Sequence, residues 1–410
     1  MQKHLVRHII TLGIIVLATL NAHAQDLDES LIQKELHDEG FEDIRIKIMA
    51  DTLYATIEDR AHRGTFRGAA TAISLINERH EGLRHFQVVI TDYRMAQLIV
   101  RASKREGTWD VSVDRDMAYA KQVLKLTEAS HPSTGKLDVT FYPLINLTNN
   151  KLDHLFDFSI RIAPAFAVSL WPGARFTVQP IIPIVNNLGY RDTKRYVQLG
   201  CTNLSQQIVA SKRWDVSAAV GFFHPERYGL QAKATFHVLR DLDFFVDAGV
   251  TGRASYQSSE ITGDGFSFST PKRINAMAGV SYYEPHTRLQ FEARAGQFLF
   301  GDRGGRIDIT SHFGEYAIGI YGIYTSGETN AGFHFAIPFG GRRQKRNGII
   351  RLRIPEYYAM EYSMQSYFRY YHQNMGEYYI TQPDENHAAR FWQPSFVEEY
   401  VRKMLNNKFK

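Results

Sequence analysis

Apolar and polar residues alternate with a period of two along most of the chain between residues 137 and 339. The clearest stretch runs from Gly301 to Phe339, where apolar faces rich in Phe, Tyr and Ile are separated by the turns Phe313-Gly314 and Ser326-Gly327. Because successive side chains of a strand point to opposite faces, each segment has one apolar face and one polar or small face. Segments of the same texture recur at 156–162, 214–222, 230–238, 242–248, 274–282 and 289–295.

The lengths and connections of these segments favour a barrel in the outer membrane. We count about 12 strands, each near the roughly 9–11 residues that a tilted transmembrane strand needs. Tight turns such as Arg240-Asp241 and longer loops such as 256–271 both occur, and Trp214 and Tyr282 stand at the ends of apolar faces, as in outer-membrane barrels. The alternative is a secreted β-sandwich, whose solvated faces would also carry charges. We predict an all-β transmembrane β-barrel over residues 136–341.

The first 24 residues predict export. Lys3 and Arg7 precede an apolar run over 9–20, and Ala22-His23-Ala24 resembles a cleavage site, which together indicate a secretory signal peptide. The run is shorter than the roughly 20 residues that span a bilayer as a helix. Together with the strand pattern, this signal predicts the outer membrane of a Gram-negative envelope, with the N-terminal domain in the periplasm.

Residues 25–130 predict a small α+β domain rather than barrel strands. Helical spacing covers 27–36 and 65–78, and alternation marks strands at 44–48, 53–57, 86–90 and 95–101. The order of helix, two strands, helix, two strands is of ferredoxin-like character. No catalytic motif stands out in it, so we expect a periplasmic scaffold or docking domain.

Composition adds two limits. Cys201 is the only cysteine, so this chain of 410 residues has no intramolecular disulfide and depends on a core or a closed sheet. The net charge of +5 is too mild an excess to indicate nucleic acid as a partner of an exported protein. We expect outer-membrane lipid as a partner.

The segment 342–410 is rich in tyrosine and follows the last predicted barrel strand. An extra strand is expected within 352–364, and the spacing of Phe396, Val397, Tyr400 and Val401 predicts a closing amphipathic helix. Two roles remain open for its aromatic residues, which suit stacking on sugar rings or packing against the barrel rim or the N-terminal domain.

Several spaced motifs are similar to those of one known family. Asn203-Leu204-Ser205-Gln206, Val220-Gly221-Phe222-Phe223, Arg227-Tyr228-Gly229 and the stretch from Gly301 to Phe339 resemble the YjbH/GfcD family. Its members are outer-membrane β-barrels encoded with exopolysaccharide or group 4 capsule genes, and typical ones are longer, with room for two barrels. The resemblance covers about 200 residues and implies a non-enzymatic role in the export or surface attachment of an exopolysaccharide or capsule. It also implies a surface polysaccharide and other exopolysaccharide-export proteins as partners.

The polar faces supply candidate contacts for such a polymer. If these faces line a lumen, their charges pair with one another and offer hydrogen bonds to the hydroxyl groups of a glycan. The candidate lumen residues are Asp157, Arg161, Lys233, Asp243, Asp247, Arg288, Glu292 and Arg294.

Signals for catalysis are weak. Asp243 and Asp247 lie on one strand face but about 13 Å apart, whereas the carboxylates of glycosidases are roughly 5–9.5 Å apart. The histidines lack metal-ligand spacing such as HExxH, so we expect neither a metal site nor a cofactor. The alternatives are a barrel-embedded enzyme that modifies envelope lipid or glycan, and a structural outer-membrane protein that docks an assembly partner.

Overall fold

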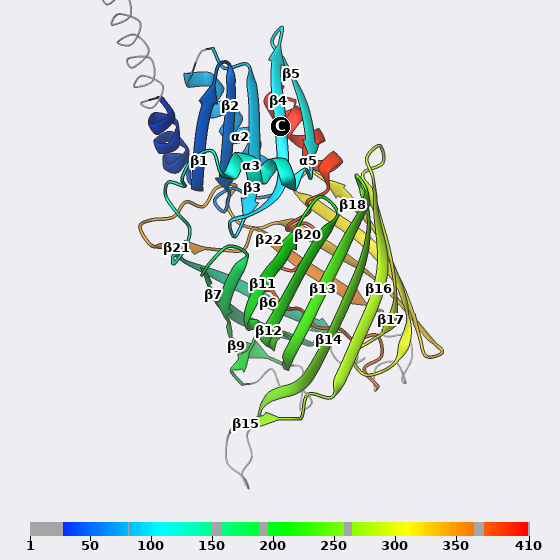
Figure 1. The fold of residues 1–410 in the computed structure, drawn as a ribbon. Coiled ribbons are helices and arrows are strands. Elements are labelled where there is room, and N and C mark those ends of the chain that lie inside the picture. The colour runs from blue at the N-terminus through cyan, green and yellow to red at the C-terminus, as the bar shows by residue number, and fades with distance from the viewer. Residues whose placement is uncertain are drawn as a thin grey trace, which may run out of the picture.

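The computed structural model describes residues 28–80, 82–148, 157–187, 196–257, 265–364 and 373–408. Two sheets organise them, a small sheet with helices and a large curled sheet beneath it (Figure 1). The predominantly β architecture predicted from the alternation, with one large antiparallel sheet, is therefore confirmed. None of the helices in these ranges is long and apolar enough to span a bilayer.

The small sheet follows the order of the chain. Its elements are β1 (Glu42–Met49), β2 (Thr52–Glu58), α2 (Arg67–Arg79), β3 (His85–Asp92), β4 (Met95–Arg105), β5 (Thr108–Asp114) and α3 (Met117–Leu124), and residues 28–39 are helical. All neighbouring strands are antiparallel except β2 and β3, which are parallel and joined through α2. A ferredoxin-like split βαβ unit would place another strand between the parallel pair, so that expectation is wrong.

The last helix of the chain completes this N-terminal domain. Helix α5 (Pro394–Leu405) buries its apolar face in the same core as α2 and the five strands. The ring of Phe66, which precedes α2, lies 5.0 Å from that of Tyr400 and 5.8 Å from that of Phe396. The two ends of the described chain therefore share one hydrophobic core, which local periodicity could not reveal.

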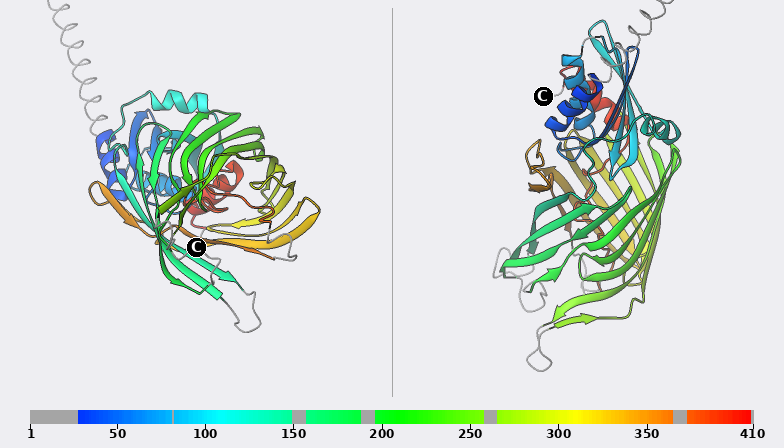
Figure 2. Two further views of the ribbon diagram at one scale, coloured as in Figure 1. Left: turned by 90° about the horizontal axis from the view of Figure 1, so that it is seen from below. Right: turned by 60° about the vertical axis from the view of Figure 1, so that its left-hand side comes forward.

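The large sheet contains the remaining strands. They are β6 (Leu137–Thr148), β7 (Asp157–Ser169), β8 (Ala174–Val178), β9 (Pro180–Asn186), β10 (Gln198–Leu199), β11 (Thr202–Ala210), β12 (Trp214–Phe223), β13 (Arg227–Leu239), β14 (Leu242–Gln257), β15 (Gly265–Phe268), β16 (Arg273–Glu284), β17 (Leu289–Gln297), β18 (Arg303–Phe313), β19 (Tyr316–Thr325), β20 (Glu328–Pro338), β21 (Ile350–Arg353) and β22 (Tyr357–Ser363). The strand order runs as a ring, with a seam at β21, which pairs in parallel with β6 while β22 pairs with β20. The sheet curls around an interior (Figure 2).

The two faces of the large sheet have opposite polarity. On β19, Tyr316, Ile318, Ile320 and Tyr324 are exposed on the outer face, whereas the residues between them are buried. The outer faces of the other strands repeat this pattern with exposed apolar residues that include Phe141, Phe166, Phe176, Ile184, Ile208, Val220, Leu230, Phe244, Val246, Ile274, Phe291, Ile307, Phe333 and Leu352. The buried inward positions include Arg161, Arg175, Asn203, Gln231, Asp243, Asn275, Asp308, Thr310, His334 and Arg351.

Several connections beside the N-terminal domain are short, such as 211–213, 240–241 and 314–315. The longer connection 339–349 also lies there, since Arg63 donates to the Gly340 carbonyl, and the opposite end has short turns at 224–226 and 326–327. The tip of the β3–β4 hairpin reaches the end of the large sheet that lies beside the N-terminal domain, here called the near end. There the Gly173 N–H donates to the Tyr93 carbonyl at 2.7 Å. Tyr93 and Arg94 both have positive φ, which is typical of a two-residue hairpin turn.

Candidate functional site

The segment 373–393, here called the tail, crosses the interior of the large sheet. Near the end opposite the N-terminal domain, Ile380 exchanges backbone hydrogen bonds of 2.8 and 3.0 Å with His224, and the Tyr379 ring stacks on Phe223. Near the other end, the Gln393 amide donates to Asp243 at 2.9 Å before the chain enters α5. The tail thus occupies the interior along its length.

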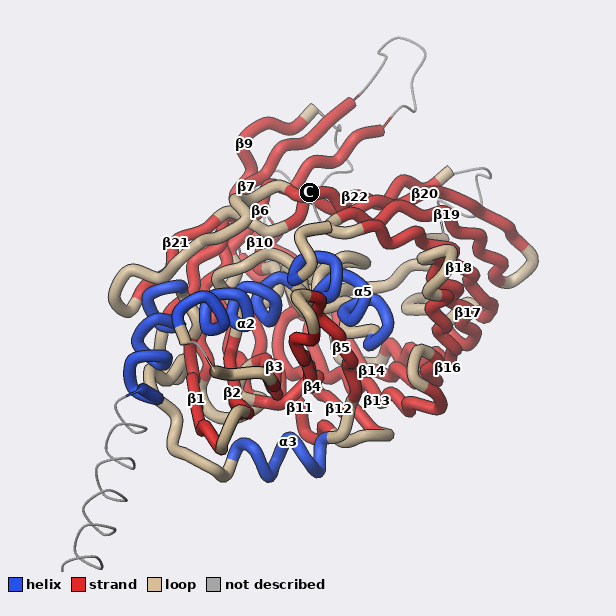
Figure 3. Tube along the Cα trace, turned by 90° about the horizontal axis from the view of Figure 1, so that it is seen from above, coloured by secondary structure: helices blue, strands red, loops and turns tan. Residues whose placement is uncertain are grey.

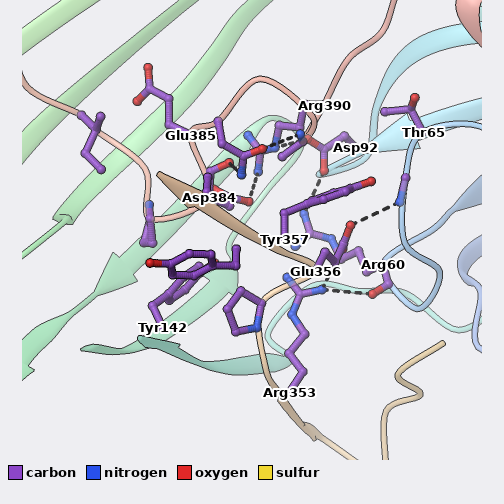
Figure 4. Close-up of a pocket in the computed structure, with 18 of the residues that line it drawn as sticks. Arg60, Thr65, Asp92, Tyr142, Arg353, Glu356, Tyr357, Asp384, Glu385 and Arg390 are labelled. Atoms are coloured by element: carbon purple, nitrogen blue, oxygen red, sulfur yellow. Dashed lines mark hydrogen bonds and ion pairs between the residues drawn. The ribbon is translucent and has the colours of Figure 1, made fainter. Parts of the chain in front are cut away.

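A cavity of about 240 Å³ lies where the N-terminal domain, the large sheet and the tail meet (Figure 4). Each of the three parts contributes charged or aromatic side chains. Its lining includes Asp59, Arg60, Asp92 and Tyr93 from the N-terminal domain, Tyr142, Arg353, Glu356 and Tyr357 from the sheet, and Asp384, Glu385, Arg390 and Trp392 from the tail and its junction with α5. We call it the mouth cavity.

Arginines connect the three parts around the mouth cavity. Arg60 lies 2.6 Å from Glu58, 3.1 Å from Asp92 and 3.4 Å from Asp138 on β6. Arg390 of the tail lies 3.3 Å from Asp384 and 3.7 Å from Asp92. Since each arginine bridges carboxylates of different segments, the network fixes the position of the N-terminal domain over the interior.

The ring of Tyr93 lies at the centre of this network. The guanidinium carbon of Arg60 is 3.4 Å from the ring centroid, and those of Arg175 and Arg390 are 5.4 and 5.7 Å away. Cations over the face of a tyrosine are attracted by its quadrupole, more strongly when water is excluded. Tyr93 is buried, so the hairpin tip anchors the domain as well as lining the cavity.

Two further carboxylates bind the N-terminal domain to the near end of the sheet. Glu315, in the β18–β19 turn, accepts from Arg63 at 2.6 Å and from Arg67 at 2.9 Å. Glu42 of β1 pairs with Arg346 and Arg351, each at 2.8 Å. Burial alone would raise the pKa of Glu42, but the two arginines outweigh burial and lower it, which keeps the carboxylate charged.

The lining of the mouth cavity suits a polyhydroxylated ligand. Its carboxylates are hydrogen-bond acceptors for hydroxyl groups, and its arginines are donors. The tyrosines and Trp392 add flat apolar faces among these polar groups. Three of these carboxylates, those of Asp92, Glu356 and Asp384, are paired with arginines.

The structure places most of the predicted lumen residues on the inner face, although not in one group. Arg161 donates to Gln198 at 3.1 Å and to Asn146 at 2.9 Å, and Asp243 lies 2.6 Å from His237 as well as near Gln393. Asp247 accepts from Gln231 at 2.7 Å. These contacts are within the wall or with the tail, so the charged groups are already hydrogen-bonded.

The remaining predicted residues divide between the lumen and the rim. Lys233 pairs in register with Asp247, and Glu292 forms an ion pair with Arg294. Arg288 was expected on a lumen-facing strand, but it lies in the turn before β17 and pairs with Glu399 of α5 at 2.9 Å. The prediction that Arg288 faces the lumen is therefore wrong. Strand β17 begins at Leu289, so Arg288 precedes the strand and lies in the turn. Asp157 begins β7, and its side chain lies outside the described residues.

The sequence did not predict the contribution of the tail to the site. The segment that contains Asp384, Glu385 and Arg390 has no apolar periodicity. The tyrosine content of 342–410 is its only signal in the sequence. That segment is divided among three places: β21 and β22 join the large sheet, the tail fills the interior and α5 joins the N-terminal domain. Tyr379 packs on Phe223 within the interior, which matches the packing role more closely than an exposed sugar platform.

Comparisons with known proteins leave the family open. No family model and no curated protein matches the chain. Among solved structures, three engineered variants of the Rhodopseudomonas blastica porin match with a TM-score of 0.26 and 8–9% identity. Each match covers 50% of this chain and 90–91% of the porin. So loose a superposition adds nothing to the argument from the strands themselves.

Proposed function

We propose that this chain is an outer-membrane β-barrel whose interior is filled by its own tail and whose N-terminal domain lies in the periplasm. The observation that carries the proposal is the belt of exposed apolar side chains on the outer face of the large sheet. In water, such a sheet would leave apolar surface solvated and bury charge. In a bilayer the same arrangement places apolar groups against lipid and keeps the charged groups inside, away from lipid.

The proposal includes an orientation of the large sheet. Outer-membrane barrels have short periplasmic turns and longer extracellular loops. The proposal places the N-terminal domain in the periplasm, with the short turns 211–213, 240–241 and 314–315 on its side of the sheet. Trp214, Tyr282 and Tyr316 lie near the periplasmic ends of their strands, and Tyr324 and Tyr362 near the outer ends, as interfacial girdles.

Heat-modifiability tests this location. Protein extracted from isolated outer membranes is run on a semi-native gel with and without boiling. A folded barrel migrates faster before boiling and partitions with the outer membrane. Recovery from the soluble periplasm with no mobility difference would overturn the proposal and favour the secreted β-sandwich.

For its role, we propose non-enzymatic participation in the export or surface attachment of an exopolysaccharide, as the resemblance to the YjbH/GfcD family implies. The chemistry of the mouth cavity supports contact with a polyhydroxylated polymer on the periplasmic side. Because the tail fills the interior, polymer does not pass through the barrel in this arrangement. The proposal therefore assigns the protein a binding or handover step beside other export proteins rather than an open conduit.

A matched pair of variants on one strand tests this role. Tyr142 lines the mouth cavity, whereas its neighbour Phe141 is exposed on the outer face of β6. In cells lacking the chromosomal copy, Tyr142→Ala is expected to reduce surface polysaccharide several-fold, and Phe141→Ala to restore it. Both must give the same amount of heat-modifiable protein. Normal polysaccharide in the deletion strain itself would contradict the proposed role without affecting the barrel.

A further inference from the structure

Three side chains from separate segments meet on the inner wall of the large sheet, and none of them lines the mouth cavity. They are Asp308 of β18, His334 of β20 and His387 of the tail. One ligand-type atom from each lies within 4.8 Å of the others. Asp308 is 1% exposed and His334 is 2% exposed, so bulk water does not solvate these two groups.

The hydrogen bonding of His334 is incomplete without a further group. Its Nδ1 is buried and has no hydrogen-bond partner, while its Nε2 lies 3.6 Å from Asp308 Oδ1 and 3.4 Å from the Thr310 hydroxyl. A neutral imidazole carries a proton on one nitrogen only. With the proton on Nε2, that N–H faces Asp308 and Thr310, and the buried Nδ1 keeps a lone pair that no donor of the described residues approaches and that a cation can accept.

The neighbouring charges tolerate a cation. Arg306 donates to both oxygens of Asp308 at 2.7 to 3.1 Å and also to both oxygens of Glu361. Arg294, which is paired with Glu292, also acts on Asp308, so three carboxylates and two guanidinium groups lie beside the histidines and the net charge of these five groups is negative. A carboxylate has about four lone-pair sites, so Asp308 can accept from Arg306 and still bind an ion. Such a hydrogen bond also orients a ligating carboxylate.

We propose that Asp308, His334 and His387 bind a divalent transition-metal ion, with Zn²⁺ as the best match to two imidazole nitrogens and one carboxylate oxygen. This donor set is one that zinc accepts, with water in a fourth position. The ion would join the barrel wall to the tail, because His387 is the tail's ligand. The rings of His334 and His387 stack with centroids 3.8 Å apart and 17° between their planes, so the two side chains are in contact, and one ring must tilt for both lone pairs to meet a single ion.

Zinc binding by the full chain, purified in detergent without a polyhistidine tag and stripped with a chelator, tests the proposal. Titration against a chromophoric chelator is expected to show about one Zn²⁺ per chain. His387→Ala is expected to weaken binding at least tenfold, and so is His334→Gln. The control is His286→Ala, which removes an exposed histidine from the β16–β17 turn and is expected to leave binding unchanged.

Each outcome decides the proposal. Parent protein that binds no zinc above the level of a chelator blank overturns it. Equal binding by parent, His387→Ala and His334→Gln places the ion elsewhere and also overturns it. All variants are first checked for the heat-dependent gel shift, so that loss of binding is not confused with misfolding. If only one of the two histidine variants keeps that shift, the retained variant alone decides the outcome.

Discussion

The N-terminal domain buries its apolar side chains in a core, whereas the large sheet exposes its apolar side chains on the outer face. In the domain, Ile46, Leu53, Val88 and Val100 point inward to a continuous apolar core that α2 and α5 cover. In the large sheet, apolar side chains point outward, and the interior holds ion pairs, the tail and small apolar clusters such as Phe223 with Tyr379. Seen from above, the helices lie over the small sheet, whereas the curved wall of the large sheet carries no helix on its outer side (Figure 3).

The comparison shows that strand alternation alone does not specify which face is inside. Both regions have a period of two, but helices with apolar stripes accompany only the first. A sheet that has no helices to cover its apolar face needs another sheet or lipid. Variants in each region test this difference.

Removing an aromatic anchor of the N-terminal domain should have the largest effect. Phe396 of α5 is buried among Phe66, Tyr283 and Phe391. Phe396→Ala should lower the free energy of unfolding of the domain by about 3–5 kcal/mol, because it leaves a cavity in a packed core. Hydrogen exchange of β1 to β5 measures this loss, while the gel shift of the barrel should persist. Lys403→Ala, at the surface of the same helix, is the control, and an equally large loss there would contradict the account.

A charge on the outer face should distinguish lipid from water. Ile320 on β19 is 62% exposed, and Leu31 of the N-terminal domain is 48% exposed. Ile320→Arg should lower barrel stability by about 2–4 kcal/mol if the residue faces the bilayer. Leu31→Arg should change the stability of its domain by no more than about 0.5 kcal/mol, as at ordinary surfaces. Urea unfolding in lipid vesicles measures both, and a neutral Ile320→Arg would argue for a solvated face.

The contact between the two regions should depend on Glu315. Glu315→Gln removes the charge that Arg63 and Arg67 share, and it leaves two buried guanidinium groups with weaker partners. The docking should weaken by about 2 kcal/mol, since the amide oxygen still accepts a hydrogen bond from the guanidinium groups and moderates the loss. Faster proteolysis after Arg63 would reveal it. Glu328→Gln, in the turn at the other end of β19, is the matched control and should leave the cleavage rate unchanged.

The smallest effect should be a pH dependence confined to the N-terminal domain. Burial lowers the pKa of His62, but Asp59 at 3.0 Å and Glu39 at 3.3 Å outweigh burial and raise it above 6.5. This contribution to stability is therefore complete below about pH 6.5 and is lost as the pH rises through the folded-state pKa. Thermal melts of the domain between pH 5.5 and 8.5 should show the decline. His62→Gln should flatten it, whereas an unchanged slope would assign the dependence to another group.

Much of the fold follows from local patterns, whereas most of the site does not. The apolar spacing of residues 27–36 and 65–78 and the alternation of Ile44, Ile46 and Ile48 agree with elements of the structure because each signal lies within one segment. Arg288 shows the limit of such reasoning. One residue decides whether a charge belongs to a lumen-facing strand or to a turn, and its partner Glu399 is 111 residues away.

The order of apolar and polar residues by itself determined that this chain builds long strands with one apolar and one polar face, after an α+β segment. Only the tertiary structure decided that the tail fills the interior, that α5 returns to the N-terminal domain, and that Asp308, His334 and His387 meet. The period of apolar residues shows which side chains within one strand or helix share a face. Contacts between segments depend on the curvature of the sheet and on the path of the tail, neither of which leaves a repeating pattern in the sequence.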